Sequence, residues 1–479
     1  MKRLTLVQQN DTHAHIAPHW ELGWRGGVPH AWRAGGYAQL RALADRIRRE
    51  AGGPCLHVDS GDAIHGTGPA QWTQGAVVVP ALNAVGVELM TPGNWEFGFG
   101  PAVLRERVAA LGFPVLACNV TRADTGEPEF AAASVREVGG VRVGVVGITS
   151  PIVSRTMPRP FGAGLRFRDA RDVLPEVVAR LRDRDRPDVV VLVSHYGFAQ
   201  EVAIARAVDG IDVILGGHTH DVLATLVRVG GTIITQSGAH GSYLTRLDLE
   251  LAHGRVCDAR HTLVPVDATG PADPTVAAVV DEALAPPRAA TDEVVGETAT
   301  LLHRGTVLTA PMDAVITEAY RATTGADVAL SHGWRYGTPI PPGPITAGDL
   351  WQMLPPNPEL FTVRLTGAEL RRMLEESLER TFAGDGLRQQ GGYVMRFAGM
   401  HALARLNNPA GARVLQLEIG GRAAEADREY VVAAAGEQSV RRREGRAMTG
   451  VHAIESVRAW LADRRPEAAV DRPPALVAV

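Results

Sequence analysis

With 479 residues, the chain is too long for a single hydrophobic core, and we expect two domains. Hydrophobic residues make up 45% and charged residues 21% of it, as in ordinary globular proteins. The net charge of −4 gives no reason to expect a nucleic acid or a membrane surface as a partner.

The cysteines and the apolar runs narrow the class of protein further. The three cysteines are far apart and form no CxxC, so neither a disulfide framework nor a zinc cluster is expected. No segment reaches the ~18 apolar residues of a membrane span. The apolar run at residues 4–7 is too short for a signal-peptide core. We therefore predict a cytoplasmic protein, or a periplasmic one if a leader has been removed.

The first half of the chain alternates short apolar strands with helical patterns. This alternation predicts a layered α/β domain over residues 1–268. The predicted strands are 4–7, 56–58, 115–117, 141–146, 189–193 and 213–215, and the predicted helices are 36–50, 77–85 and 102–111. An N-terminal loop carries Trp20, Trp24 and Trp32, and either caps a site or packs as an ordinary loop.

Proline and glycine punctuate the chain near residue 270. We predict a connector helix within 269–293, a smaller α/β substrate domain over 294–465 and a peripheral tail over 466–479. In the second domain, helices are expected at 314–323 and 367–380, and strands at 360–365 and 430–435.

The most informative stretch is Gly216-Gly217-His218-Thr219-His220, directly after an apolar strand. In extended backbone, residues i and i+2 point the same way, so His218 and His220 can face one small volume. Imidazole is a common ligand of borderline transition metals, which makes a metal ion the natural occupant. The alternative is a turn with two solvated histidines.

Four other predicted strand-to-loop junctions also deliver acidic, amide or imidazole side chains. In α/β sheets the ligand crevice lies at the carboxyl ends of the strands, so all five junctions can converge. The other four are Asn10-Asp11-Thr12-His13, Asp59-Ser60-Gly61-Asp62, Gly93-Asn94-Trp95-Glu96 and Ser194-His195-Tyr196-Gly197.

In this order, the motifs Asp-x-His, Gly-Asp, Gly-Asn-x-Glu, His-x-Gly and Gly-His-x-His resemble those of the dinuclear metallophosphoesterases. With a second domain following, the chain resembles the 5′-nucleotidase superfamily over nearly its whole length. The resemblance implies a layered αββα metallophosphoesterase sandwich and two divalent ions, with manganese favoured over zinc or iron. It implies that Asp11, His13, Asp62 and His220 hold one ion, and that Asn94, His195, His218 and the shared Asp62 hold the other.

One position departs from the pattern. In phosphomonoester-cleaving relatives, the residue after the ligand asparagine is a histidine that serves as an acid near the leaving group; here it is Trp95. Indole has no titratable proton near neutral pH, so Trp95 cannot supply general acid catalysis. Other histidines near the expected site, which could serve instead or merely be solvated, are His15, His65 and His240.

Trp95 has a parallel in another branch of the superfamily. The stretch 60–75, the triplet Trp95-Glu96-Phe97, residues 330–337 and Gly391-Gly392-Tyr393-Val394 resemble the thiosulfohydrolases of bacterial sulfur oxidation. These enzymes release sulfate from a cysteine-bound thiosulfonate on a carrier protein. Sulfur is a better leaving atom than an alkoxide, so the missing acid matters less there. Asn94 and the missing export signal favour the nucleotidase pattern instead.

The second domain is expected to contact the substrate. By resemblance, Arg335 binds the anionic group, for which guanidinium is well suited, and Tyr393 is one face of a base-stacking clamp. Residues 431–459 contain no aromatic residue for the opposite face, which weakens the expectation of a nucleotide substrate.

We therefore predict a metal-dependent hydrolase that cleaves a phosphate ester by a metal-activated water, with Asp62, Asn94 and Trp95 nearest the reaction. The alternative is thiosulfohydrolase-like release of sulfate from a carrier-protein cysteine adduct. A third hypothesis is a metal-holding binding protein in which Trp95 marks a lost activity. The expected partner is a small anionic substrate.

Overall fold

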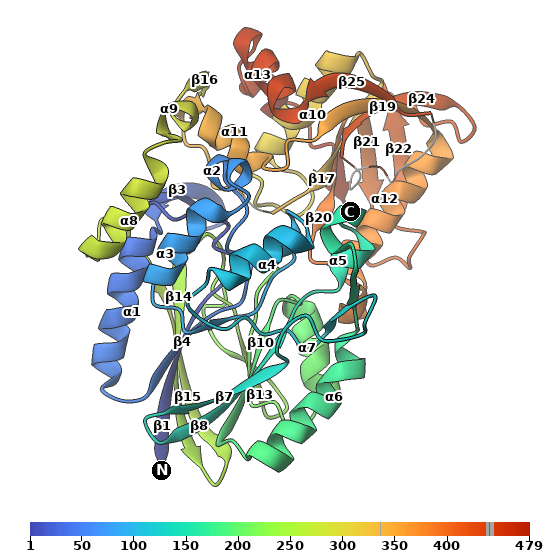
Figure 1. Ribbon diagram of the computed structural model, residues 1–479. Coiled ribbons are helices and arrows are strands. Elements are labelled where there is room, and N and C mark those ends of the chain that lie inside the picture. Colours follow the sequence, from blue (N-terminus) through green and yellow to red (C-terminus); the bar gives the residue numbers. More distant parts are fainter. Residues whose placement is uncertain (336, 437–439, 441–444) are drawn as a thin grey trace. The chain divides into compact units, whose positions relative to one another are not determined.

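The computed structural model describes residues 1–335, 337–436, 440 and 445–479. The chain divides into two compact units: the first comprises Met1–His19 and Arg33–Pro286, and the second comprises Trp20–Trp32 and Pro287–Val479 (Figure 1). The tryptophan-rich stretch was predicted as a loop of the first domain. It instead forms a hairpin of β2 (His19–Arg25) and β3 (Val28–Ala34), most of which groups with the second unit.

The first unit is built on two stacked sheets. One has the order β15-β14-β1-β4-β5, and the other has the order β12-β13-β11-β10-β8-β7. The first sheet consists of β1 (Lys2–Gln9), β4 (Cys55–Asp59), β5 (Leu89–Met90), β14 (Tyr243–Ala252) and β15 (Arg255–Pro265). The second consists of β7 (Ala133–Val138), β8 (Val141–Ile148), β10 (Val189–Ser194), β11 (Val213–Leu215), β12 (Val227–Val229) and β13 (Thr232–Thr235).

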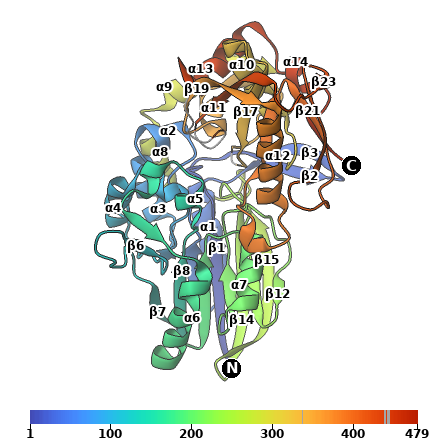
Figure 2. The ribbon, with the colours of Figure 1, turned by 90° about the vertical axis from the view of Figure 1, so that its right-hand side faces the viewer.

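Apolar side chains hold these layers together. Leu6 and Val58 of one sheet and Val191 and Val213 of the other belong to a single buried cluster between the sheets. A second cluster joins the outer face of the first sheet to α1 (Tyr37–Ala51), α3 (Val79–Ala84) and α8 (Pro274–Leu284). The other sheet is covered by α6 (Ala170–Arg180) and α7 (Phe198–Ala207) (Figure 2). The predicted αββα sandwich is therefore confirmed.

The strand directions bring the candidate residues to one edge of the sandwich. Strands β1, β4 and β5 run parallel, as do β8, β10, β11 and β13. The loops that follow β1 and β4 are joined by backbone hydrogen bonds from Asp11 N to Gly61 O (2.8 Å) and from His13 N to Asp62 O (2.8 Å). Two separate motifs thus become one rigid unit at the carboxyl ends of the strands.

Several local predictions need correction. Residues 115–117 were predicted as a strand but form only two isolated bridges, Val115 with Met90 and Leu116 with Ala131. The segment runs beside each neighbour for too few residues to form a ladder. Residues 77–85 begin in a 3-10 turn, Ala76–Val78, before α3. The long antiparallel pair of β14 and β15 was not predicted. The helix α8 of the predicted connector packs into the core of the first unit through Val276 and Val280.

Other short elements of the first unit lie in its connections. They are α2 (Gly68–Trp72), the 3-10 turn Trp95–Phe97, α4 (Pro101–Ala109), β6 (Val120–Arg122), α5 (Ile152–Arg155), the 3-10 turn Arg159–Gly162, β9 (Leu165–Phe167) and the π-helical turn Leu181–Asp185. The chain's three cysteines, Cys55, Cys118 and Cys257, are free.

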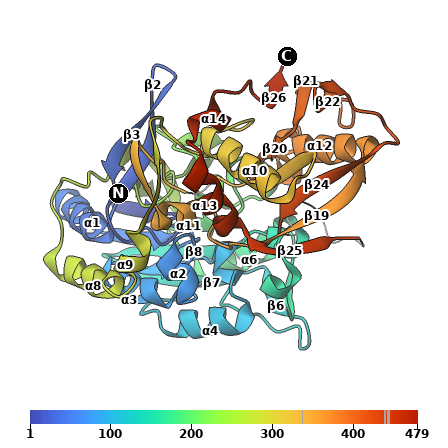
Figure 3. The ribbon, with the colours of Figure 1, turned by 90° about the horizontal axis from the view of Figure 1, so that it is seen from above.

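The second unit has a central sheet of order β20-β17-β24-β19-β25. Its strands are β17 (Val328–Gly333), β19 (Glu359–Thr366), β20 (Tyr393–Ala398), β24 (Glu429–Ala435) and β25 (Ala447–His452). One buried cluster joins this sheet to α10 (Pro311–Thr324), α11 (Ala347–Met353) and α13 (Ala453–Asp463), and another joins it to α12 (Gly367–Phe382) (Figure 3). The smaller elements are α9 (Arg288–Thr291), β16 (Val294–Thr298), β18 (Gly343–Thr346), β21 (Met400–Ala404), β22 (Val414–Ile419), β23 (Arg422–Ala423) and the 3-10 turn Gly386–Arg388.

The tail is not peripheral, contrary to the prediction. It forms α14 (Glu467–Val470) and β26 (Leu476–Ala478), which pairs with β21 in parallel. Ala469 and Leu476 are buried in the two clusters of the second unit. Buried apolar side chains, the pairing with β21 and hydrogen bonds from Thr298 and Ala299 to Glu467 hold this segment. None of these contacts is visible as a periodic pattern in the sequence.

Candidate metal centre

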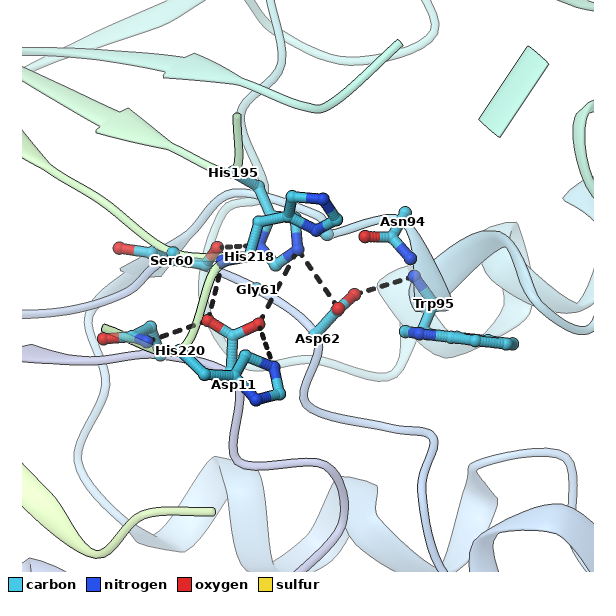
Figure 4. Close-up of polar contacts among 12 residues, drawn as sticks. Asp11, Ser60, Gly61, Asp62, Asn94, Trp95, His195, His218 and His220 are labelled. Carbon is cyan, nitrogen blue, oxygen red and sulfur yellow. Dashed lines mark hydrogen bonds and ion pairs between the residues drawn. The ribbon is translucent and has the colours of Figure 1, made fainter. Parts of the chain in front are cut away.

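Six of the seven residues predicted as metal ligands form two groups at the edge of the sandwich. The ligand atoms of Asp11, His13 and His220 lie within 4.8 Å of one another, and so do those of Asp62, His195 and His218. Figure 4 shows Asp11, Asp62, His195, His218 and His220 gathered around a common volume, with Asn94 beside Asp62. Apart from His220, which is 10% exposed at its side chain, all of them are buried.

Asp62 lies between the two groups. Its Oδ2 is 3.1 Å from His195 Nε2 and 3.9 Å from His13 Nε2, whereas its Oδ1 accepts a hydrogen bond from Trp95 N at 2.7 Å. Asp11 is arranged similarly: Oδ1 is 3.3 Å from His220 Nε2, and Oδ2 accepts from His218 N at 2.8 Å. In each carboxylate one oxygen is held by backbone and the other faces imidazoles.

Backbone carbonyls orient two of the imidazoles. His195 Nδ1 is 2.6 Å from Ser60 O, and His13 Nδ1 is 3.0 Å from His65 O. An Nδ1–H that donates to a carbonyl leaves Nε2 with a lone pair, which is how metal-binding histidines are usually oriented. The Nε2 atoms of His13 and His220 then meet at 3.0 Å.

The arrangement fits cations. The carbonyl oxygen of Asn94, Oδ1, is buried and has no hydrogen-bond partner among the described residues, while its amide nitrogen contacts Met157 Sδ at 3.6 Å. Two buried carboxylates, an unsatisfied carbonyl and converging imidazole nitrogens form an N/O donor set that suits manganese, zinc or iron. Buried polar atoms of this kind are costly unless they are paired or coordinate a metal.

The backbone at this edge is strained. Outside glycine, a positive φ is uncommon, yet it occurs at Asp11 (50°), His13 (46°), Asp62 (58°), His218 (70°) and His220 (59°). Such conformations persist only where the surrounding structure enforces them, and they cluster at functional sites. Five of the predicted ligands therefore share a conformational cost that residue type alone does not indicate.

The electrostatics follow from burial and from the two carboxylates. Burial lowers the pKa of His13 to about 3, against the opposing effect of Asp62, and so keeps this imidazole neutral. Burial also opposes the charge on His195, but Asp62 and Asp11 prevail and raise its pKa to about 10. For Asp62, burial favours the neutral form, and the neighbouring His195 and His13 nonetheless bring its pKa below the usual range.

Trp95 forms an apolar wall of the site. It is buried, and its indole stacks on the imidazole of His65 with ring centroids 4.2 Å apart and planes 15° from parallel. Burial lowers the pKa of His65 to about 4, so this histidine is a poor proton donor near neutral pH. His15 and His240 pack on each other with centroids 4.6 Å apart, and His240 also lies 5.9 Å from His220.

Two glutamates that sequence reasoning did not assign to the site support its loops. Glu96 accepts backbone hydrogen bonds from Asp62 (2.8 Å), Ala63 (2.6 Å) and Gly93 (2.6 Å), which ties the Asp62 loop to the Asn94 turn. Burial and the neighbouring Asp62 raise its pKa to about 7. Glu201, on α7, lies behind His195 and His218. The sequence offers one common sign of these roles. Glu96 comes three positions after Gly93, and Glu201 comes four positions after Gly197.

The two predicted substrate residues lie together in the second unit. The Arg335 guanidinium lies 5.9 Å from the centroid of the Tyr393 ring, and the Arg396 guanidinium lies 5.5 Å from it. Arg396 is buried and pairs with Asp313 at 3.1 Å. A nucleobase stacked on Tyr393 would compete with these cation–π contacts.

Comparison with known families agrees with this geometry. Residues 4–222 match the calcineurin-like phosphoesterases, and residues 294–436 match the 5′-nucleotidase C-terminal domain. Among curated proteins, the trifunctional nucleotide phosphoesterase YfkN of Bacillus subtilis is 25% identical over 87% of this chain and 30% of its own length. Escherichia coli UshA is 24% identical over 55% of this chain and 52% of its own length. The chain thus spans about half or less of the length of these relatives.

Two solved structures match nearly the whole chain. The sulfate thiohydrolase SoxB of Thermus thermophilus has a TM-score of 0.91 and 29% identity, covering 99% of this chain and 96% of its own. A 5′-nucleotidase precursor from Thermus thermophilus has a TM-score of 0.85 and 25% identity, covering 100% of this chain and 99% of its own. The chain belongs to the 5′-nucleotidase superfamily, with a calcineurin-like phosphoesterase domain followed by a 5′-nucleotidase C-terminal domain.

Proposed function

We propose that the chain is a metal-dependent hydrolase of small phosphomonoesters. The observation that carries this proposal is the convergence of two ligand groups with Asp62 between them. Asp11, His13, His220 and Asp62 would hold one divalent ion, and Asp62, Asn94, His195 and His218 would hold the other. When bound, such a pair supplies Lewis acidity toward substrate oxygens and a strong nucleophile at neutral pH.

The chain's own residues then position the reaction. The backbone contacts of Asp11 and Asp62 fix one oxygen of each carboxylate, so that the other stays aimed at the site. Arg335 would bind the anionic group of the substrate by bidentate hydrogen bonds. Trp95 and His65 exclude water on one side without donating a proton, which favours substrates with good leaving groups.

The substrate preference follows from Tyr393. Because two guanidinium groups already lie near its ring, we expect little gain from a nucleobase. The manganese-loaded protein should therefore hydrolyse p-nitrophenyl phosphate with a kcat/KM at least equal to that for adenosine monophosphate. A preference for the nucleotide of about tenfold or more, ~1.4 kcal/mol, would contradict this assignment of Tyr393.

A second candidate is release of sulfate from a cysteine S-thiosulfonate on a carrier protein. It is favoured by Trp95 and by the similarity to the sulfate thiohydrolase. Sulfate release from an S-thiosulfonate peptide, together with no phosphate release from either ester, would select this candidate. Bound metal without turnover of any of these substrates would select a binding role instead.

Location bears on the second candidate. None of the helices in the described part of the chain has both the length and the apolar character that crossing a bilayer requires. The predictions of a cytoplasmic or periplasmic location both stay open, and fractionation of the native host would distinguish them.

A further inference from the structure

Glu201 connects the two loops that carry His195 and His218. It lies in the first turn of α7 and is completely buried. Its Oε1 accepts a hydrogen bond from Gly197 N at 3.3 Å, two residues after His195. Its other oxygen, Oε2, lies against Gly216, two residues before His218. Burial raises the pKa of this carboxyl to about 8.

The paired glycines before His218 are explained by this contact. A Cβ at Gly216 would lie 2.1 Å from Glu201 Oε2, too close for any side chain. A Cβ at Gly217 would lie 3.0 Å from Asp11 Oδ2 and 3.1 Å from His195 Nδ1. The two glycines that follow β11 are therefore enclosed by Glu201 on one side and by Asp11 and His195 on the other.

A different residue holds the loop from Gly217 to Asp221, which carries both His218 and His220. Gln236 Nε2 donates to Gly217 O at 2.6 Å, and its Oε1 accepts from Asp221 N at 2.6 Å and from Thr219 Oγ1 at 3.1 Å. Glu201 and Gln236 thus hold different parts of the two loops. Glu201 bonds just after His195 and lies against Gly216, whereas Gln236 bonds on both sides of His218 and of His220.

We propose that Glu201 is a positioning residue that sets the spacing of His195 and His218, and so selectively controls the affinity of the ion at Asp62, His195 and His218. It touches neither ion nor substrate. The proposal rests on the proposed metal-dependent function. Loss of Glu201 should leave the ion at Asp11, His13 and His220 in place, because its ligands are held by Gln236, by His65 O and by backbone N–H groups.

The test is manganese titration of the metal-free full chain, followed by calorimetry and by Mn(II) EPR, which distinguishes a single ion from a coupled pair. Wild type should bind two ions and show the coupled signal. Glu201→Ala should weaken one binding event about 10- to 100-fold and give the single-ion signal at intermediate manganese. Glu201→Gln keeps an acceptor for Gly197 N and should recover part of the loss.

The second unit offers a matched control. Glu375 on α12 is also a buried carboxylate that accepts from two backbone N–H groups, those of Arg413 (3.1 Å) and Val414 (2.6 Å). Glu375→Ala should lower the melting temperature without changing the manganese titration. The positioning role is wrong if both Glu201 variants keep the two manganese-binding steps unchanged, or if they weaken both steps equally. It is also wrong if Glu375→Ala weakens manganese binding as Glu201→Ala does. If wild type binds no manganese, the proposed function itself fails.

Discussion

Two regions that bury charge neutralise it in different ways. At the metal centre, the carboxylates of Asp11 and Asp62 face imidazoles and backbone N–H groups. In the second unit, the buried Asp313 faces two buried arginines. Arg304 binds its Oδ1 at 2.9 and 2.6 Å, and Arg396 approaches its Oδ2 at 3.1 Å.

The two arginines also bond to backbone carbonyls. Arg304 also donates to Met353 O and His332 O, each at 2.8 Å, and Arg396 donates to Val307 O at 3.0 Å. Arg396 Nε and Asp313 Oδ2 make no hydrogen bond but face each other as an ion pair. The metal centre instead combines two carboxylates with several imidazoles, of which burial keeps His13 neutral, and with an amide oxygen that lacks a hydrogen-bond partner among the described residues. In one region the buried carboxylate is neutralised by arginines of the chain, whereas in the other the donor set fits cations from solution.

The largest effect is expected from Asp62→Ala. Because the Asp62 carboxylate lies between both ligand groups, its loss should remove both ions and reduce hydrolysis to background. Metal content after gel filtration, measured by mass spectrometry, checks this. A variant that retains both ions would show that Asp62 does not bridge them.

Asp313→Ala tests the other region. It leaves two buried guanidinium groups without their carboxylate, which should cost about 3–5 kcal/mol of unfolding free energy. Guanidinium denaturation measures the loss, and hydrogen exchange should locate it in β17, β20 and α10. Unchanged manganese binding is the control; a loss below ~1 kcal/mol would show that Asp313 is not needed to neutralise the two arginines.

Chelation should affect only the first region. Ions present at about 100 times their dissociation constant stabilise a protein by ~2.7 kcal/mol. Removing them with EDTA should increase amide exchange at residues 11–15, 60–66 and 216–221, while exchange around Arg304 and Asp313 stays the same. Equal acceleration in both regions would contradict the distinction between them.

The smallest effect is expected from Trp95→His. An imidazole here restores a titratable group beside Asn94, but it loses the stacked contact with His65. We expect phosphomonoesterase activity to rise about tenfold. This is less than the ~10²–10⁴-fold rate enhancement that a correctly positioned general acid supplies. Trp95→Phe is the control, since it keeps an apolar ring; if both variants respond alike, the missing acid does not limit the rate.

The chemistry of the metal centre was largely predictable from the sequence. Asp11, Asp62, Asn94, His195 and the His218–His220 pair each follow an apolar strand, and parallel strands present their carboxyl ends at one edge. Strand type and the alternation of layers depend on local periodicity, so the sandwich and most of its elements were expected. The same logic failed for 115–117, for the hairpin of β2 and β3 and for the tail, whose pairing depends on distant partners.

Other features exist only in the folded chain. A left-handed backbone at five ligands is unfavourable locally and is maintained by contacts between loops far apart in sequence, such as that from His13 N to Asp62 O. Glu96 belonged to the Gly-Asn-x-Glu motif but had no assigned role, and Glu201 had none either, until their carboxyls are seen to bond the loops that carry the candidate ligands. Residue type set which atoms can bind a cation, whereas packing set their spacing, because spacing depends on long-range contacts that no local pattern encodes.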